Sequence, residues 1–376
     1  MRKVALDLGT RKTTYCEVQD ARVVQRATVT AVQSLDSLLG SEQPAAVVAI
    51  EACREAWFVH DLLTSWGNQV VLVDTTRSRR LGIGQHGRKT DRIDAEVLAL
   101  ALERGGIPVA HVLSPHRREL RRWLGVRRAL VESRAQLVTT ARGLAREYGA
   151  PLPRCTTERF VRNVRKLQSD PKLGATLEPL LKMLETTSVE LERVEQELAK
   201  LCVTEPLVSL LATAPGIGPV VAASFVSVID EAKRFRSAHH VQSYLGLVPT
   251  EDSSGGKRRL GAISKKGNKY LRALLVQSAW TILRTADRTD PLRMWAEAVA
   301  ARRGKPIAVI ALARRLVGVL WAMWSKSTVY NASHLATLNS RGLTQAAQSL
   351  EFRIDALKRA SKKLSMKRLT ATEVTH

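Results

Sequence analysis

Short apolar runs separated by turn-sized gaps constrain the N-terminal part of the chain more than any other feature. Three of them are β-branched and closely spaced, which predicts an antiparallel meander. The other two are continuously apolar, as is typical of strands buried on both faces, and short helices at 33–39 and 54–66 precede and separate them. The five runs occupy residues 3–8, 13–18, 23–29, 45–50 and 69–73. The order β-β-β-α-β-α-β predicts a mixed sheet with helices on its faces.

The rest of the chain is predicted to be mainly helical. A helix is expected at 91–102, a long Arg-rich helix at 114–147, and a second globular unit from about residue 206 to residue 326. Between the Arg-rich helix and the second globular unit, mostly apolar residues recur at alternating spacings of four and three positions. This seam predicts a coiled coil, which packs either between chains or within the subunit. The seam consists of Leu180, Leu184, Thr187, Leu191, Val194, Leu198 and Leu201. The predicted class is therefore α/β plus α.

The charge of the chain indicates a polyanionic partner. Lys and Arg number 59 against 35 Asp and Glu, which gives a net charge of +24 and an isoelectric point near 10.5. Nucleic acid is the partner that this excess favours. The basic density begins at Arg77 and recurs along the Arg-rich helix, where few Glu partners are expected, so phosphate contact is favoured over solvated faces. The candidate phosphate contacts are Arg77, Arg79, Arg80, Arg118, Arg121, Arg122 and Arg128.

Cysteine usage and hydropathy exclude two classes of protein. The four cysteines form no CxxC pair, which argues against a disulfide framework or a cysteine zinc site and fits the cytoplasm. The apolar stretch at 307–324 is interrupted by Arg314 and Arg315, so it predicts a buried helix rather than a membrane span. No membrane partner is expected.

Four carboxylates suggest a metal site. Asp7 lies in the first strand, Glu51 ends the fourth, and Asp91 and Asp94 are separated by three residues on one helix. If the first and fourth strands are neighbours, hard oxygen donors converge there, as Mg²⁺ or Mn²⁺ requires, and two such ions can serve phosphoryl transfer. Each acid also has an ordinary structural interpretation, such as Asp91 at the positive end of the helix dipole. The turn after Asp7 resembles a phosphate loop of actin-like ATPases and sugar kinases, but a second such turn is missing.

Two glycine-containing segments in the second unit suggest DNA contact. The PGIG sequence with Gly216 and Gly218 resembles the turn of a helix-hairpin-helix, whose backbone N–H groups approach phosphate, although a packed turn needs no ligand. Downstream, a Ser-Ser-Gly-Gly sequence has the composition of a flexible loop. Neighbouring cations make a phosphoryl-transfer serine chemically feasible there. These cations are Lys257, Arg258, Arg259, Lys265 and Lys266.

Together, these segments resemble one family in their order along the chain. KTDRIDA and SSGGKRRLGAISKKGNKYLR are its most specific segments, and the strand acids, PGIG and YLGLVP accompany them. The chain resembles the DEDD transposases related to Piv-type DNA invertases, whose members are bridge-RNA-guided recombinases. The resemblance covers about residues 3–326. It implies a RuvC-like, ribonuclease-H-type domain with Arg-rich helices at 1–165 and a transposase domain at 206–330. The heptad seam places a coiled-coil helix at 166–205 between them, and the Lys-rich composition of the last residues predicts a basic helical tail at 331–376, which is not part of the resemblance.

The resemblance also implies a mechanism. Asp7, Glu51, Asp91 and Asp94 would bind Mg²⁺ or Mn²⁺, and Ser254 would be the nucleophile that forms a phosphoserine with DNA, with Ser253 as the second choice. The site would form between subunits of a homodimer that assembles into a tetramer. A noncoding guide RNA would select target and donor DNA by base pairing. The protein would be prokaryotic, cytoplasmic and associated with the nucleoid when active.

Three other functions compete with this interpretation. A metal-dependent, structure-selective endonuclease of the Holliday-junction resolvase type needs the carboxylates but not Ser254. An actin-like ATPase or kinase would use the turn after Asp7. A non-catalytic scaffold would bind RNA or DNA and need none of the five residues.

Overall fold

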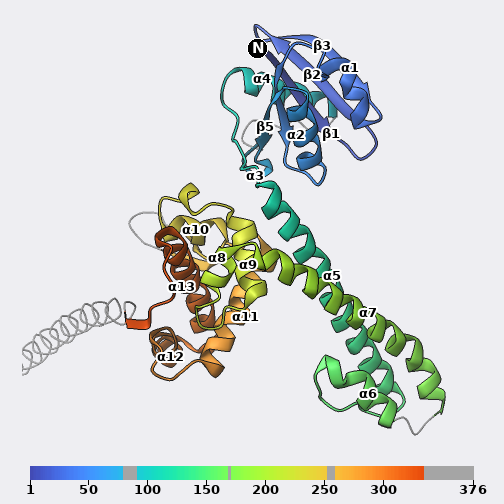
Figure 1. The fold of residues 1–376 in the computed structure, drawn as a ribbon, viewed down its shortest axis with the longest axis vertical. Helices are drawn as coiled ribbons and strands as arrows, with labels where there is room; N and C mark the ends of the chain where they lie inside the picture. Colours follow the sequence, from blue (N-terminus) through green and yellow to red (C-terminus); the bar gives the residue numbers. More distant parts are fainter. Residues whose placement is uncertain (79–90, 168–170, 252–258, 334–376) are drawn as a thin grey trace, which may run out of the picture. The chain divides into compact units, whose positions relative to one another are not determined.

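The computed structural model describes residues 1–78, 91–167, 171–251 and 259–333 (Figure 1). Within it the chain forms two compact units, one over 1–113 and the other over 114–376. The Arg-rich helix packs in the second unit, whereas the sequence grouped it with the first domain. Each unit has its own hydrophobic core.

A five-stranded mixed sheet organises the first unit, in the order β3-β2-β1-β4-β5. Its strands are β1 (Arg2–Leu8), β2 (Thr13–Gln19), β3 (Arg22–Val29), β4 (Ala46–Glu51) and β5 (Gln69–Val73). The central strand β1 pairs antiparallel with β2 and parallel with β4, which in turn pairs parallel with β5. The predicted mixed sheet is therefore confirmed, and the first and fourth strands are neighbours.

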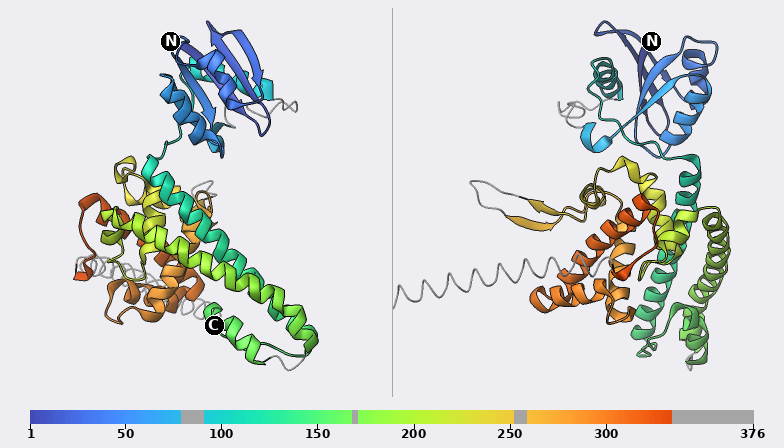
Figure 2. Two further views of the ribbon diagram at one scale, coloured as in Figure 1. Left: turned by 45° about the vertical axis from the view of Figure 1, so that its right-hand side comes forward. Right: turned by 60° about the vertical axis from the view of Figure 1, so that its left-hand side comes forward.

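Helices cover both faces of this sheet (Figure 2). The helices are η1 (Val32–Leu35), α1 (Asp36–Leu39), α2 (Ala56–Ser65), α3 (Thr75–Ser78) and α4 (Asp91–Glu103). Strand residues alternate between the faces. Val4 and Leu6 pack on the side of α1 and α2, whereas Ala5 packs on the side of α4. This alternation decides which strand side chains face α4.

Two long antiparallel helices dominate the first part of the second unit. They are α5 (Pro115–Glu147) and α7 (Pro171–Val203), with α6 (Thr157–Leu167) packed against them. Most residues of the predicted seam are buried against the chain's own helices, which are therefore the partners of the seam within the described structure. The buried stripe also continues through Leu177 and Leu173, N-terminal to Pro179, which lies inside the helix.

The remaining elements form a helical body with one β-hairpin. They are α8 (Pro206–Leu211), α9 (Pro219–Ile229), η3 (Ala232–Arg234), α10 (Ala238–Tyr244), β6 (Pro249–Glu251), β7 (Leu260–Ile263), α11 (Lys269–Thr285), α12 (Pro291–Arg303) and α13 (Lys305–Lys326). Helix α13 is long and apolar enough to cross a membrane by composition alone. Its Leu312, Leu316 and Leu320 are nevertheless fully buried in this body, as expected of a core helix.

Candidate active site

Asp7 and Glu51 lie at the same edge of the sheet and on the same face. The parallel register of β1 and β4 pairs Leu6 with Ile50, so these acids are the next residues of adjacent strands. Because side chains alternate, Asp7 follows Ala5, and Glu51 follows Ala49, onto the face that α4 covers. The Oε1 atom of Glu51 is buried and has no hydrogen-bond partner within the described part of the chain. A buried carboxylate oxygen of this kind calls for a positive partner.

Two contacts fix the direction of α4 across the sheet. Near the C-terminus of α4, Glu103 Oε2 accepts a hydrogen bond of 2.9 Å from the N–H of Ala21, beside the start of β3. Two residues past Asp94, Glu96 forms an ion pair with Arg26 of β3 at the level of Ala5. The N-terminal end of α4 therefore lies toward Asp7 and Glu51. The stripe of Ala95, Leu98 and Leu102, which packs on the sheet, continues toward this end.

Three of the four predicted metal ligands are thus at one end of one face. Asp94 is half-buried in the first turn of α4, and Asp91 is the first residue of that helix, although its side chain lies outside the described residues. Among the side chains that the structure describes, no three His, Cys, Asp or Glu residues form a metal-binding group. The predicted donors are all carboxylates, and one of their oxygens, in Glu51, is buried without a partner in the described ranges of the chain. This set fits a hard divalent cation.

The hairpin of β6 and β7 flanks the predicted nucleophile. Pro249 pairs with Ile263, and Glu251 with Leu260, so the strands lead into and out of residues 252–258 (Figure 2). Ser253 and Ser254 lie within this segment, outside the described residues. The same applies to Lys257 and Arg258, and in the first unit to Arg79 and Arg80.

Two glycines join the predicted motif segments at the base of the hairpin. Gly246 of YLGLVP has a φ of +70° and Gly267 of ISKKGN has a φ of +99°. A Cβ on either glycine would overlap backbone atoms of the other segment. The N–H of Lys265 also donates to the carbonyl of Gly246 at 3.1 Å. The exposed Lys265 and Lys266 are therefore held at the foot of the strands that flank the serines.

The PGIG segment forms a turn between α8 and α9. Gly216 has a φ of +69°, and a Cβ on it would lie 2.8 Å from the carbonyl oxygen of Ser278 in α11. Close packing on α11 is thus sufficient to require this glycine. Gly218, by contrast, has open space around it. Phosphate contact at this turn stays a prediction.

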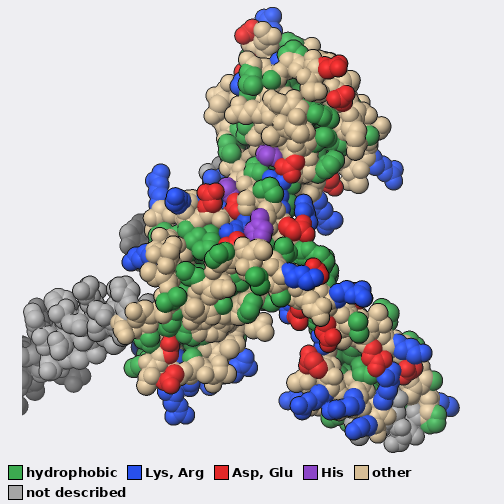
Figure 3. All heavy atoms as spheres, viewed as in Figure 1, with side chains coloured by type: hydrophobic (Ala, Val, Ile, Leu, Met, Phe, Trp, Pro, Cys, Tyr) green, Lys and Arg blue, Asp and Glu red, His purple; other side chains and the backbone are tan. Residues whose placement is uncertain are grey.

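Most arginines of α5 have carboxylate partners, so the expectation of few Glu partners was wrong. The partners come from the same helix three or four residues away and from α6, α7 and the segment before α8, where the sequence could not place them. The ion pairs are Arg122–Glu119, Arg128–Glu132, Arg127–Glu195, Arg134–Glu158 and Arg117–Glu205. On the visible face of these helices, basic and acidic side chains are interleaved (Figure 3).

The candidate phosphate contacts differ in accessibility. Arg118 is only 3% exposed, which does not suit contact with a phosphate backbone. Arg121 and Arg122 are exposed, and Arg77 is exposed beside Asp74, 3.6 Å away. Surface pairs of this kind contribute little and exchange readily for phosphate.

The sequence did not identify a buried polar junction at the start of α5. Asp230 accepts hydrogen bonds from the N–H and the hydroxyl of Ser114, at 3.2 and 2.8 Å, and lies 3.8 Å from Arg117. Glu205 also pairs with Arg117. These acids are 88 or more residues away along the chain, and no local pattern links them to Arg117. The junction fixes the start of α5 against α8 and α9.

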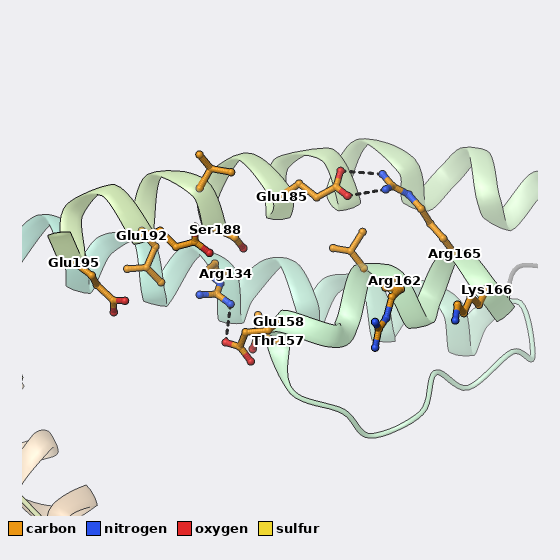
Figure 4. A pocket seen from close by; sticks show the side chains of 13 residues that line it. Arg134, Thr157, Glu158, Arg162, Arg165, Lys166, Glu185, Ser188, Glu192 and Glu195 are labelled. Carbon is orange, nitrogen blue, oxygen red and sulfur yellow. Dashed lines mark hydrogen bonds and ion pairs between the residues drawn. The ribbon is translucent and has the colours of Figure 1, made fainter. Parts of the chain in front are cut away.

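A hollow of about 710 Å³ lies between α5, α6 and α7 (Figure 4). The side of this hollow formed by α6 is mainly basic and the side formed by α7 is acidic. Arg165 of α6 forms an ion pair with Glu185 of α7 at 2.6 Å and so links the two sides. Arg134 donates to Glu158 at 3.0 Å, while its Nε atom is buried without a partner in the described structure. The mixed charge does not favour a polyanion, and none of the predicted site residues lines this hollow.

Comparison with known proteins identifies the family. Residues 208–292 match the model of the Transposase IS116/IS110/IS902 family, and residues 4–149 match a transposase model of the IS110 DEDD type. A probable family 20 transposase of Pseudomonas aeruginosa is 30% identical over 294 residues, which cover 76% of this chain and 86% of the relative. The chain belongs to the IS116/IS110/IS902 family of transposases.

Two further insertion-sequence transposases are similar to this chain over 249 residues or more. The transposase of insertion sequence IS1328 from Yersinia enterocolitica is 27% identical over 335 residues, covering 87% of this chain and 98% of the relative. That of IS1111A from Coxiella burnetii is 29% identical over 249 residues, covering 64% and 68%. As an insertion-sequence transposase, the chain acts on DNA. The five-stranded mixed sheet is consistent with the RuvC-like domain expected of the DEDD type.

Proposed function

We propose that this transposase cuts and rejoins DNA through a phosphoserine on Ser254, with Mg²⁺ or Mn²⁺ held by Asp7, Glu51, Asp91 and Asp94. The observation that supports it most is the convergence of β1, β4 and the start of α4 at one end of one sheet face, where a buried oxygen of Glu51 has no hydrogen-bond partner among the described residues. DEDD transposases generally use divalent metal ions. A bound divalent ion would polarise the scissile phosphate.

The chain's own groups would do the rest of the chemistry. The serine hydroxyl attacks phosphorus, its Oγ–P bond forms, and the bond from phosphorus to the leaving deoxyribose oxygen breaks. The serine hydroxyl gives up its proton as the Oγ–P bond forms, and the leaving deoxyribose oxygen takes up one proton, so that no proton is gained or lost overall. Lys265 and Lys266, fixed at the foot of the hairpin, would offset the negative charge of the transition state. The phosphoserine ester keeps the energy of the broken bond available for rejoining.

Guide RNA and assembly form the second part of the proposal, and they rest on the family resemblance. A noncoding RNA would select donor and target DNA, and a homodimer forming a tetramer would combine the carboxylates of one subunit with the serine of another. The excess of cations is compatible with two polyanions. Sequencing the RNA that copurifies with the protein tests this part, because a guided enzyme must carry one discrete structured species.

The serine mechanism is tested by substitution. Ser254→Ala is expected to abolish both recombination and the covalent protein–DNA adduct, whereas Ser253→Ala, the matched control, retains both. Asp7→Ala is expected to lower the rate about 10²–10³-fold, because charge stabilisation at the phosphate is lost. A Ser254→Ala protein that still forms the adduct would disprove the assignment of the nucleophile.

A metal-only endonuclease is the second candidate. It is favoured by the fact that the described geometry supports the carboxylates independently of the serine hairpin. In that case Ser254→Ala would keep full cleavage activity and produce free DNA ends without attached protein.

A further inference from the structure

A small cleft in the second unit is lined by cations, and none of the described residues that line it is a carboxylate. It measures about 260 Å³ and lies between α5, α9 and the N-terminus of α11. Arg121 and Arg128 of α5 and Lys269 of α11 supply three positive charges at its wall. Leu124 and Leu271, both nearly or fully buried, form part of its floor.

The polar groups of the floor are already satisfied. The hydroxyl of Ser224 donates to the carbonyl of Val220 at 2.7 Å, and that of Ser227 donates to the carbonyl of Ser224 at 3.0 Å. Neither hydroxyl therefore requires a ligand as its hydrogen-bond acceptor. Recognition in this cleft therefore depends on the cations and on backbone N–H groups.

The start of α11 presents such N–H groups. The side chain of Asn268 caps the helix by accepting from the N–H of Leu271 at 2.9 Å. The N–H groups of Lys269 and Tyr270 have no acceptor among the residues that the structure describes. In a helix of 17 residues these groups lie at the positive end of the helix dipole, in line with the neighbouring cations.

Arg128 is oriented toward this end of α11. Its guanidinium lies 5.3 Å from the ring centroid of Tyr270 and also pairs with Glu132 at 2.8 Å. That pair is solvent-accessible and holds Arg128 only weakly. The stacking on Tyr270 keeps the guanidinium beside the cleft, where it can donate to an oxyanion.

We propose that this cleft binds one backbone phosphate of the DNA strand on which the transposase acts. The ligand class follows from the compact tetrahedral anion that three cations and two N–H groups fit. DNA is the source favoured by the chain's order, because α11 follows Lys265 and Lys266 at the foot of the serine hairpin. This inference rests on the proposed function and adds a phosphate anchor to it.

Binding measurements with the full-length protein test the anchor. Fluorescence anisotropy would follow a labelled DNA duplex of random sequence, and a duplex RNA of the same sequence, over a range of salt concentrations. Arg128→Gln and Lys269→Gln are each expected to raise the Kd for DNA about tenfold, as for one charged hydrogen bond. Because both cations hold one phosphate, the double variant should lower the slope of log K against log salt by only about 0.9.

Lys305→Gln is the matched control. Lys305 is also an exposed lysine at the first residue of a long helix, and this variant loses the same charge outside the cleft. It should bind DNA within twofold of the unaltered protein. If Lys305→Gln and Lys269→Gln weaken DNA binding equally, the cleft contributes only its share of the overall positive charge and the proposal is overturned. A loss of affinity for RNA but not for DNA would also overturn it.

The outcome is independent of the serine chemistry. If Ser254→Ala shows that no phosphoserine forms while the cleft variants still lose DNA affinity, the anchor stands and the mechanism fails. If the adduct forms normally and the cleft variants bind DNA unchanged, the mechanism stands and the anchor fails. Thermal unfolding of each variant confirms that the fold is kept.

Discussion

Two glycines control how the YLGLVP and ISKKGN segments meet. Gly246 and Gly267 have positive φ angles, and each faces the backbone of the other segment without room for a Cβ. Gly149, at the end of α5, also has a positive φ of +66° but open space around it. A comparison of Gly246 with Gly149 therefore separates the energetic cost of a positive φ from the cost of overlap between an added Cβ and neighbouring backbone atoms.

Gly246→Ala is expected to destabilise the second unit by more than Gly149→Ala. The left-handed angle alone costs about 1–2 kcal/mol in both variants. Overlap with the backbone around Lys266 adds about 1–3 kcal/mol at Gly246 only. Urea unfolding followed by circular dichroism measures the difference, and equal losses would show that the two segments can separate without cost.

A charged cluster on β1 and β2 makes the stability of the first unit depend on pH. Arg2 donates to both carboxylate oxygens of Glu17 at 2.9 and 2.7 Å, and Tyr15 donates to the same carboxylate. These hydrogen bonds, chiefly that from Arg2, hold the pKa of Glu17 below its ordinary value. Burial and the neighbouring carboxylate raise the pKa of Tyr15.

Glu17→Gln should therefore destabilise the protein more at neutral than at acid pH. A carboxylate whose pKa is lowered by folding stabilises the folded state when the pH is above its pKa in the unfolded chain, about 4.3. This contribution is lost as the pH falls through the pKa in the folded state. The expected loss at pH 7 is about 1–3 kcal/mol. Unfolding by urea at pH 7 and pH 3 tests it, with the exposed Glu42→Gln as control. If the difference in free energy of unfolding between the unaltered protein and Glu17→Gln is the same at both pH values, the charge of Glu17 does not have this role.

At the scale of elements, the sequence predicts those parts of the fold that depend on local patterns. Short β-branched runs placed the five strands within about one or two residues, because alternation and burial act over a few neighbours. The heptad seam that identifies α7 begins at Leu180, directly after Pro179, within the coiled-coil helix expected over 166–205. The observed helix runs from Pro171 to Val203 through Pro179, and burial of Leu173 and Leu177 against α5 and α6 compensates for the hydrogen bond that this proline cannot make.

The candidate site divides in the same way. The sequence brings Asp7 and Glu51 to one edge on the condition that the first and fourth strands are neighbours, and the observed sheet order meets this condition. The partners of the arginines on α5 were not predictable, because Glu195, Glu158 and Glu205 reach them only through packing between helices. An excess of arginine in the sequence therefore overstates the charge left for phosphate.

The seam of α7 is expected to act within one chain. Leu184 is 1% exposed against the chain's own helices, whereas the neighbouring Met183 is 58% exposed. Leu184→Ala should cost about 2–5 kcal/mol and Met183→Ala less than about 0.5 kcal/mol. Thermal unfolding at two protein concentrations is the test. A loss of stability in Leu184→Ala that grows on dilution would instead assign the seam to an interface between chains.

At the scale of the whole molecule, the predicted catalytic residues are divided between two compact units. All four predicted metal ligands belong to residues 1–113, and the serine segment belongs to 114–376. The first unit has two hydrophobic cores of its own, one on each face of the sheet. A unit with its own core and all its ligands can fold and bind metal without the other.

A fragment of residues 1–113 is therefore expected to unfold cooperatively and to bind Mn²⁺. Glu51→Gln should weaken that binding at least tenfold in calorimetric titration, because it removes the charge from the buried, unpaired oxygen at the sheet edge. Glu42→Gln, an exposed acid away from that edge, should leave the affinity unchanged. Mn²⁺ binding to the intact chain but not to a folded fragment would mean that the second unit supplies a ligand. The four carboxylates would then be an incomplete site.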